Sequence, residues 1–257
     1  LPDAFVTWFF VLNVGMVIAI TFGLLHYFVG RRNLFQERSE LLLLNILPKE
    51  ICEALKTEPR AIAAHYDDAS ILFADIVEFT PMAATMMPLS LVDLLNEVFE
   101  CFDELVDKYD LEKIKTIGDC YMVAAGVPRP RPDHAQALVD LALDMRAEIG
   151  RRAFGGRRLA FRIGINSGPV VAGVIGHKKF IYDLWGETVN MASRMESHGQ
   201  SGAIQITRNT FELVSGEFDC EARGVIEVKG AGRVESWCVT GRKPAGGQPA
   251  SGTSCIA

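Results

Sequence analysis

Residues 113–126 read KIKTIGDCYMVAAG, two short apolar runs that meet at Gly118 and Asp119. A glycine-aspartate pair between two such runs is typical of a tight hairpin turn. This stretch therefore predicts two short strands around Gly118, with Asp119 held in the turn between them.

The segments on either side of this hairpin predict an α+β domain. Before it, ASILFADI (residues 69–76) is typical of a strand, and apolar residues between positions 91 and 106 recur at helical spacing. After it, apolar residues between 138 and 149 predict a second helix, and LAFRIGINSG and PVVAGVIG (159–176) predict two more strands. The β-α-β-β-α-β order is that of a ferredoxin-like fold.

The C-terminal part adds a smaller α/β subdomain to this core. A helix is predicted over 189–197, and strands are predicted near 203–206, 224–228 and 235–239. We expect the whole catalytic-type domain to span residues 67–242. The remaining residues, 243–257, are rich in Pro, Gly and Ser and are predicted to be disordered.

The N-terminal segment is apolar enough to cross a membrane. Residues 4–29 contain no Asp, Glu, Lys or Arg, and about 20 apolar residues span a bilayer as a helix. A signal peptide would have a shorter apolar core with basic residues before it, whereas here Arg31 and Arg32 follow it. Residues 1–30 are thus predicted to be the last helix of a longer membrane domain, with the following domain on the cytoplasmic side of the plasma membrane.

Residues 31–66 are predicted to be a cytoplasmic helical connector. A short heptad-like stripe with spacings of seven and three residues is formed by Leu34, Leu41, Leu44 and Leu47. Pro48 is expected to end or bend this helix. The stripe fits a parallel pair of helices from two chains, and it fits equally well a single helix packed on the next domain.

Composition excludes one class of function. The 257 residues carry a formal net charge of −6 and no clustered basic excess, so no nucleic-acid partner is expected. The six cysteines form no CxxC pair and no metal-ligand spacing with the histidines, which favours incidental thiols in a reducing compartment.

Two carboxylates are expected to converge at one edge of the sheet. Asp75 ends the strand at 69–76 and Asp119 lies in the hairpin turn, and these elements are neighbours in a split βαββαβ fold. An all-oxygen site selects Mg²⁺ or Mn²⁺, and two such ions suit in-line displacement at phosphorus. Either aspartate alone fits a turn or cap, but the pair in this topology favours a metal site.

Other polar residues have both a structural and a functional interpretation. Residues 76–80, IVEFT, lead into a helix whose N–H groups at Phe79 and Thr80 are able to bind a triphosphate, although an N-cap at Thr80 gives the same pattern. Taken singly, Lys115 fits a solvated strand position and Asp183 fits a turn. Asn190 and Arg194 fit a pair on a helix surface at i and i+4.

Taken together, four segments in this order and spacing resemble the class III adenylyl cyclases. They are FADIVEFT, KIKTIGDCYMVAAG, FRIGINSGPVVAGVIG and YDLWGETVNMASRMES. The likeness extends roughly over residues 44–239 and is greatest to the mammalian-type branch of membrane-bound bacterial, including mycobacterial, enzymes. It implies an enzyme that converts ATP to 3′,5′-cyclic AMP and pyrophosphate at two Mg²⁺ or Mn²⁺ ions per site.

The resemblance implies roles for individual residues. Asp75 and Asp119, with the backbone carbonyl of Ile76, resemble the metal ligands. Lys115 and Asp183 resemble the pair that reads adenine. Asn190 resembles the residue that positions the ribose, and Arg194 the one that stabilises charge on the α-phosphoryl group. Arg162 and Lys229 resemble two further phosphate contacts.

The resemblance also implies a homodimer with two shared sites, because one chain carries both sets of residues. One chain would supply Asp75, Asp119 and Arg162, and the other the remaining residues. Three alternatives stand beside it. A guanylyl cyclase usually has Glu and Cys or a similar pair at the purine-reading positions, a non-catalytic sensing module usually lacks part of the set, and diguanylate cyclases and polymerase palms have a different acidic turn.

Overall fold

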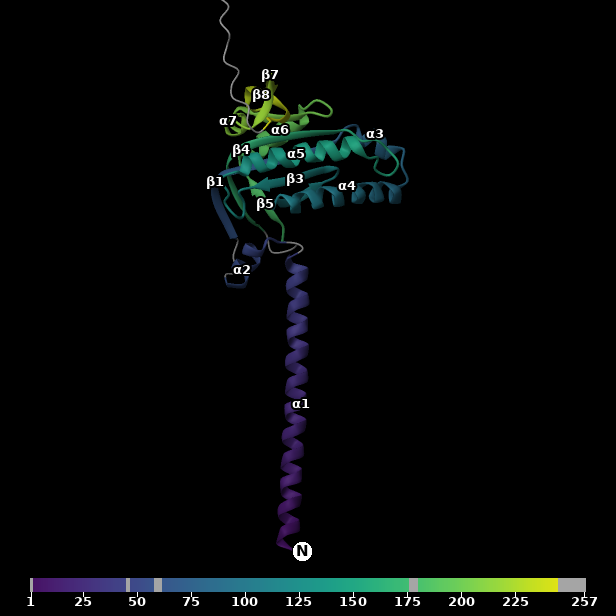
Figure 1. Ribbon diagram of the computed structural model, residues 1–257, viewed down its shortest axis with the longest axis vertical. Helices are drawn as coiled ribbons and strands as arrows, with labels where there is room; N and C mark the ends of the chain where they lie inside the picture. Colours follow the sequence, from purple (N-terminus) through teal and green to yellow (C-terminus); the bar gives the residue numbers. More distant parts are fainter. Residues whose placement is uncertain (1, 45–46, 58–61, 176–179, 245–257) are drawn as a thin grey trace, which may run out of the picture. The chain divides into compact units, whose positions relative to one another are not determined.

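The structure is a computed structural model that describes residues 2–44, 47–57, 62–175 and 180–244. The chain divides into two compact units, Leu1–Glu58 and Pro59–Ala257. Figure 1 labels most of their helices and strands. Most of the predicted tail, 245–257, lies outside the described residues.

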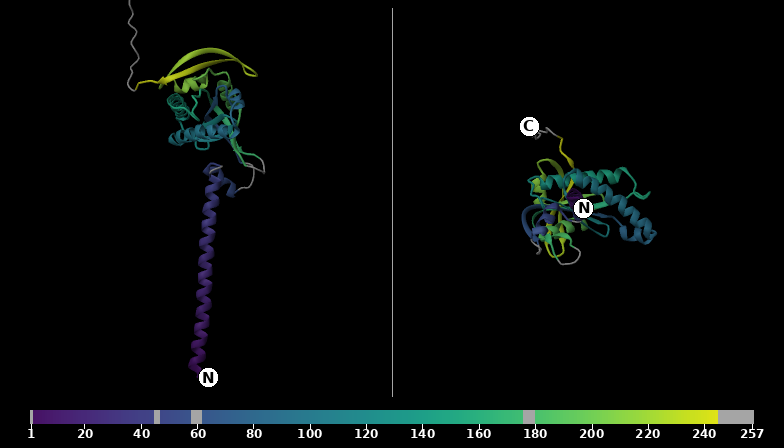
Figure 2. Two further views of the ribbon diagram at one scale, coloured as in Figure 1. Left: turned by 90° about the vertical axis from the view of Figure 1, so that its right-hand side faces the viewer. Right: turned by 90° about the horizontal axis from the view of Figure 1, so that it is seen from below.

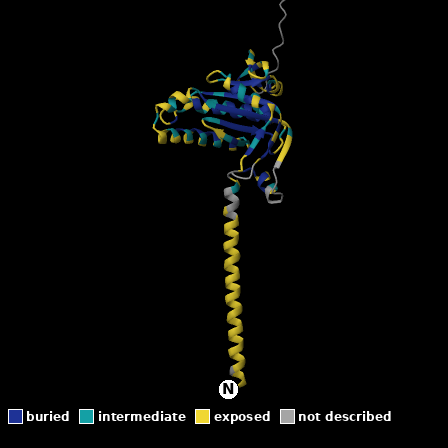
Figure 3. Cartoon of the chain, turned by 180° about the vertical axis from the view of Figure 1, so that it is seen from behind, coloured by how far each residue is buried: buried dark blue, intermediate teal, exposed yellow. Residues whose placement is uncertain are grey.

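The first unit contains the apolar helix. Helix α1 spans Asp3–Leu44 and a short helix α2 spans Lys49–Thr57. Within α1, the stretch Val6–Gln36 reaches a mean hydropathy of 2.2 and is exposed along its length (Figure 3). By length and composition this helix is able to cross a membrane.

The predicted leucine stripe does not lie on one helix. Helix α1 ends at Leu44, and Pro48 directly precedes α2. Leu34 and Leu44 are exposed, whereas Leu47 is buried and lies beyond the end of α1. The side chain of Leu41 is outside the described part of the structure. A pairing of two α1 helices through the stripe therefore has Leu34 and Leu44 as its described members.

The second unit is built on a mixed sheet. Within the described ranges the strands pair in the order β2-β3-β1-β4-β6-β8-β7, and β5 pairs with β4 outside this path. The strands are β1 Ile62–Ile76, β2 Glu112–Ile117, β3 Cys120–Ala125, β4 Phe161–Val174, β5 Tyr182–Trp185, β6 Ile204–Thr207, β7 Phe218–Val228 and β8 Gly232–Arg242. The helices are α3 Phe79–Ala84, α4 Pro88–Lys108, α5 His134–Arg151, α6 Glu187–Ser197 and α7 Arg208–Val214.

The predicted β-α-β-β-α-β order is confirmed by β1, α4, β2, β3, α5 and β4. Strand β1 lies between β3 and β4 and is antiparallel to both. The hairpin of β2 and β3 turns at Gly118 and Asp119, with Ile117 opposite Cys120. This arrangement places the end of β1 next to the hairpin turn.

Two strands predicted over 159–176 form one continuous strand, β4. The prediction separated them at Gly168 and Pro169. The pairing of β4 with β1 shifts register between Tyr66 and Ala69, so Pro169 has no partner across the ladder. Because no N–H is required at such an irregularity, proline is tolerated inside the strand.

Two short elements were missed by the sequence analysis, β5 and α7. Each is too short to show a clear period of its own. Strand β5 exists because its residues pair with β4, with Trp185 opposite Val171. Helix α7 begins after Thr207, whose hydroxyl accepts a hydrogen bond from the N–H of Thr210.

Helices cover both faces of the sheet. Ile163 and Ile165 of β4 face a core shared with α4 and α5, where Phe102 and Leu138 are fully buried. Burying one such side chain contributes about 2 kcal/mol. Since side chains alternate along a strand, Gly164 faces the other way, where a Cβ would lie 2.0 Å from the backbone N of Glu196 in α6. The β7–β8 hairpin forms one edge of the sheet and is the long curved ribbon in the left view of Figure 2.

Candidate active site

The end of β1 carries the first carboxylate of the candidate site. Ala74 and Ile76 face the core, so strand alternation turns Asp75 to the face that α6 covers. Arg162 is opposite Asp75 in β4, and its Nη2 donates to Asp75 Oδ2 at 2.8 Å. The same guanidinium donates from Nε to Glu196 Oε1 at 2.9 Å. Arg162 therefore joins carboxylates from β1 and α6.

The hairpin turn brings Asp119 to Asp75, as the topology predicts. Gly118 has a φ of +65°, which glycine adopts without steric cost. Burial first, and then the nearby Asp75 carboxylate, raises the pKa of Asp119 from 3.8 to about 6. The backbone N–H groups of Asp119 and Ile76 oppose this rise by hydrogen bonding to the charged form. The two carboxylates therefore lie close enough to interact electrostatically.

Glu196 is a third carboxylate at this site, and the sequence analysis missed it. It is only 6% exposed. Burial and the Asp75 charge raise its pKa, and Arg162 opposes that rise. Glu196 lies four residues after the buried Ala192, so the two share one face of α6. This spacing in the sequence was the signal that an acidic side chain would lie on the buried face of the helix.

Lys115 and Asp183 form a second group. Lys115 Nζ donates to Asp183 Oδ2 at 2.5 Å, and the two side chains are 31% and 19% exposed. Asp183 also accepts from the N–H of Leu184 at 2.8 Å through Oδ1. Asp183 lies in strand β5, so its interpretation as a turn residue is wrong.

A β-bulge in β2 gives Lys115 its direction. Lys113 pairs with Val123 and Lys115 with Met122, so the register shifts between the two lysines. Lys113 binds Asp103 of α4 at 2.6 Å, on the core face. Without the shift, the period of two would turn both lysines to that face. The bulge re-aims Lys115 to the opposite face, toward Asp183.

A third group lies on the outer side of α6. Asn190 is exposed and Arg194 is half-buried, and the predicted i, i+4 pair shares one face of this helix. A Cβ at Gly230 would lie 3.8 Å from Arg194 Nη2, so Arg194 reaches the turn of the β7–β8 hairpin. The exposed Lys229 precedes Gly230 in the same turn. Arg194 therefore lies close to the turn that also contains Lys229.

One chain does not bring these groups together. Arg194 and Glu196 are two positions apart, so they point about 200° away from each other around the helix. Among the described residues, no hydrogen bond or ion pair joins the Asp75 group to Lys115, Asp183, Asn190 or Arg194. The carboxylate group of Asp75, Asp119, Glu196 and Arg162 is thus separate, in its hydrogen bonds, from the other predicted site residues.

The helix after β1 begins two residues earlier than its cap pattern predicted. Helix α3 starts at Phe79, with Glu78 as N-cap at a φ of 58° and no side-chain cap. The interpretation of Thr80 as N-cap is therefore wrong, because Thr80 already lies within the first turn. Phe79 packs against the core and Thr80 is exposed.

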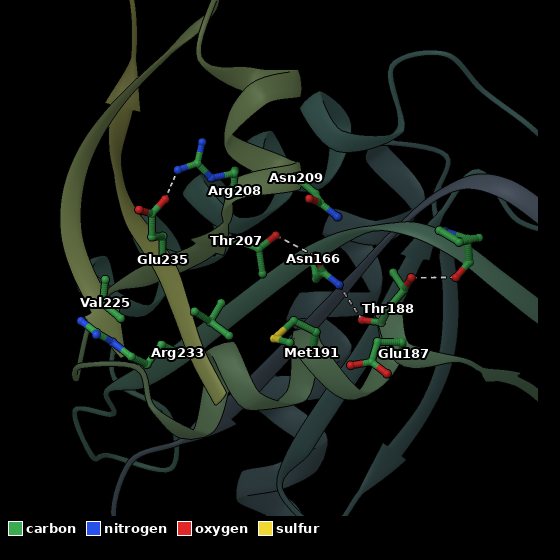
Figure 4. Close-up of a pocket in the computed structure, with 12 residues that line it drawn as sticks. Asn166, Glu187, Thr188, Met191, Thr207, Arg208, Asn209, Val225, Arg233 and Glu235 are labelled. Carbon is green, nitrogen blue, oxygen red and sulfur yellow. Dashed lines mark hydrogen bonds and ion pairs between the residues drawn. The ribbon is translucent and has the colours of Figure 1, made fainter. Parts of the chain in front are cut away.

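A cavity of about 890 Å³ lies away from the predicted site residues. It is bordered by the start of α6, the start of α7 and the β7–β8 hairpin, and Asn166 lies at its wall (Figure 4). None of the predicted site residues lines it. The cavity is therefore distinct from the group of predicted site residues.

The sequence and the fold are similar to those of known proteins. The family described as "Adenylate and Guanylate cyclase catalytic domain" matches residues 62–241. The chain belongs to this family.

Individual relatives include both purine specificities. An adenylate cyclase of Mycobacterium tuberculosis is 50% identical over 211 residues, which is 81% of this chain and 48% of the relative. The chain thus spans about half the length of that protein. Among solved structures, the guanylate cyclase domain of RhGC from Catenaria anguillulae, in complex with GTP, has a TM-score of 0.69 at 36% identity. That match covers 70% of this chain and all of the RhGC domain. The adenylyl cyclase CyaB from P. aeruginosa has a TM-score of 0.64 at 29% identity and covers 70% of this chain and 96% of CyaB.

Cyclase domains of this family depend on metal ions, and the Asp75 group fits such an ion. No cluster of three or more His, Cys, Asp or Glu side chains with metal-binding geometry occurs within the described ranges. Burial and the nearby Asp75 carboxylate raise the pKa of Asp119, and a divalent cation between the two carboxylates would oppose that rise.

Proposed function

We propose that this chain is the catalytic part of a membrane-anchored adenylate cyclase that converts ATP to 3′,5′-cyclic AMP and pyrophosphate. The observation that carries the proposal is the ion pair of Lys115 and Asp183. The same chain also contains all the other predicted site residues. The membrane anchor would be α1, with the catalytic unit on the cytoplasmic side of the plasma membrane.

The Lys115–Asp183 pair favours adenine over guanine. A lysine ammonium only donates hydrogen bonds and an ionised aspartate only accepts them. Adenine offers an acceptor at N1 and a donor at its 6-amino group, which matches this pair. Guanine offers the reverse pattern at N1 and O6, and a polar mismatch in a partly buried pocket strongly lowers affinity. ATP is therefore the proposed substrate.

We propose that Asp75, Asp119 and the carbonyl of Ile76 hold two Mg²⁺ or Mn²⁺ ions per site. When bound, such ions promote loss of the 3′-OH proton and offset the charge of the phosphates. Phe79 and Thr80 would contact the triphosphate through backbone N–H groups. Arg162 would also contact the phosphates. Its hydrogen bonds to Asp75 and Glu196 support this role, because they keep its guanidinium beside the proposed metal ligands.

In this proposal one chain supplies a metal half-site, and another supplies an α6 half-site that acts on the purine, the ribose and the α-phosphoryl group. The metal half-site comprises Asp75, Asp119 and Arg162, and the α6 half-site comprises Lys115, Asp183, Asn190, Arg194 and Lys229. Asn190 would orient the ribose so that the 3′-oxygen is in line with the α-phosphorus and the departing pyrophosphate. Arg194 would stabilise charge as it develops on the α-phosphoryl oxygens. Lys229, next to Gly230 in the hairpin turn, would neutralise the pyrophosphate as it leaves.

These roles require a homodimer. Arg162 links Asp75 to Glu196 on one side of α6, and Arg194 points to the other side of this helix. A complete site would form when the metal half of one chain meets the α6 half of another. A symmetric pairing of identical chains produces two equivalent sites. A monomer would be inactive.

The test is product formation by the full chain, purified in detergent, from ATP and from GTP with Mn²⁺ and with Mg²⁺. Cyclic AMP from the wild type and none from Asp119→Ala is the expected result. Preferential formation of cyclic GMP would favour a guanylate cyclase, the alternative to which the RhGC similarity points. No cyclic nucleotide from a folded, dimeric wild type would leave a non-catalytic nucleotide-sensing module.

A further inference from the structure

Asn166 is a buried amide that the proposed mechanism does not use. It lies in β4 on the face that α6 covers and is 5% exposed. Its Nδ2 donates to the backbone oxygen of Thr188 at 3.0 Å, and its Oδ1 accepts from Thr207 Oγ1 at 2.7 Å (Figure 4). The side chain thus links β4, the end of β6 and the first turn of α6.

The same turn of α6 is held to β4 by a second hydrogen bond. Thr188 Oγ1 donates to the backbone oxygen of Pro169 at 2.7 Å. Gly168 permits this contact, because a Cβ there would lie 2.9 Å from Thr188 Oγ1. The start of α6 is therefore clamped to the strand by one hydrogen bond donated in each direction.

Packing alone does not fix the start of α6. Glu187, Thr188 and Met191 border the cavity of about 890 Å³, so this side of the helix faces open space where side chains would otherwise pack. The hydrogen bonds of Asn166 and Thr188 hold the helix at that point.

The position of α6 sets the position of the α6 half-site. Asn190 follows Thr188 in the same turn, and Arg194 lies one turn further. Within the described ranges neither side chain makes a hydrogen bond or ion pair, so the helix backbone places both. A shift of α6 would move both groups together.

We propose that Asn166 is a positioning residue that holds α6, and through it Asn190 and Arg194, in the geometry that the reaction needs. The inference rests on the proposed cyclase activity. An amide suits the position because it donates to one neighbour and accepts from the other. An ionised aspartate of the same shape would put two acceptors, its own oxygen and that of Thr188, at about 3 Å.

The first test compares Asn166→Asp with a matched control, Ser167→Ala, in the full chain. Ser167 is 2% exposed in the same strand, and its hydroxyl is hydrogen-bonded to Ser70 and Thr210. Within the described residues this hydroxyl makes no hydrogen bond to α6. A displacement near 1 Å costs about 10²-fold in rate, so Asn166→Asp is expected to lower kcat about a hundredfold while the KM for ATP stays near the wild-type value. Ser167→Ala is expected to lower Tm but to keep kcat. Equal kcat values for the two variants would overturn the proposal.

The second test asks which half-site is damaged. Mixed with Asp119→Ala chains, Asn166→Asp chains are expected to recover activity, because one site in each mixed dimer is then intact. Mixed with Arg194→Ala chains they are expected not to recover, since both changes damage the α6 half. The reverse pattern would overturn the proposal. An inactive wild type would instead refute the cyclase activity itself, and Asn166→Ser serves the same comparisons if the aspartate variant does not fold.

Discussion

Recovery of activity in a mixture of two inactive variants is the strongest prediction of a shared site. Asp119→Ala removes a carboxylate from the metal half, and Lys115→Ala removes the purine contact from the other half. The two residues belong to one hairpin, yet Asp119 interacts with Asp75 and Lys115 with Asp183. Each variant alone should be inactive, because both sites of its homodimer lack one group.

The size of the recovery follows from counting sites. When two variants associate at random in equal amounts, about half of the dimers are mixed, and each mixed dimer has one site with both defects and one with neither. Activity should therefore return to about one quarter of the wild-type value per chain. Chains with two different affinity tags allow the mixed dimers to be isolated, and chromatographic measurement of cyclic AMP gives the rate.

A matched control uses two changes in the same half. Asp119→Ala mixed with Asp75→Ala leaves every site with a damaged metal half, so no recovery is expected. Activity in this control, or none in isolated mixed dimers of Asp119→Ala and Lys115→Ala, would refute the division of the site between chains.

Three further predictions concern charge, purine choice and the connector. Burial and Asp75 raise the pKa of Asp119 above its unfolded value of 3.8, so its ionisation destabilises the metal-free domain. Metal-free stability should therefore fall as pH rises from about 4 to about 6, and Asp119→Asn should remove that fall and raise Tm at pH 7 in chelator, which thermal unfolding measures. The double change Lys115→Glu and Asp183→Cys should shift the ratio of kcat/KM values from ATP toward GTP, and an unchanged ratio would mean that another pocket reads the purine. Leu44→Pro, at the end of α1, should change kcat without changing the KM for ATP if the connector orients the two catalytic units, and unaltered kinetics would identify it as a passive tether.

The sequence predicted the parts of the site that depend on local pattern and topology. The order of strands and helices places Asp75 beside the hairpin turn, and the i, i+4 spacing places Asn190 and Arg194 on one helix face. Both follow from periodicity and from the pairing rules of the fold. Their chemical roles remain a proposal that the mixing experiment tests.

Features that depend on pairing across the sheet were not predictable in this way. The direction of Lys115 follows from the bulge after Lys113, which exists only because β2 is matched against β3. Likewise Pro169 is accommodated in β4 because β1 shifts register opposite it. No local propensity of residues 113–115 or 168–170 encodes these shifts, so tertiary pairing decides them.

The metal half-site also explains why the chain keeps an unfavourable cluster of charge. The Arg162 guanidinium bonds Asp75 and Glu196, and Asp119 is a third carboxylate next to Asp75. Burial raises the pKa of both Asp119 and Glu196, so the domain alone would be more stable with neutral residues at these positions. A divalent ion held by the two aspartates would offset that repulsion, and the carboxylates whose ionisation opposes folding would then contribute to ligand binding. Residues that conflict with the stability of the isolated domain are expected where function selects them, and here they lie at the point where the end of β1, the hairpin turn and the buried face of α6 meet.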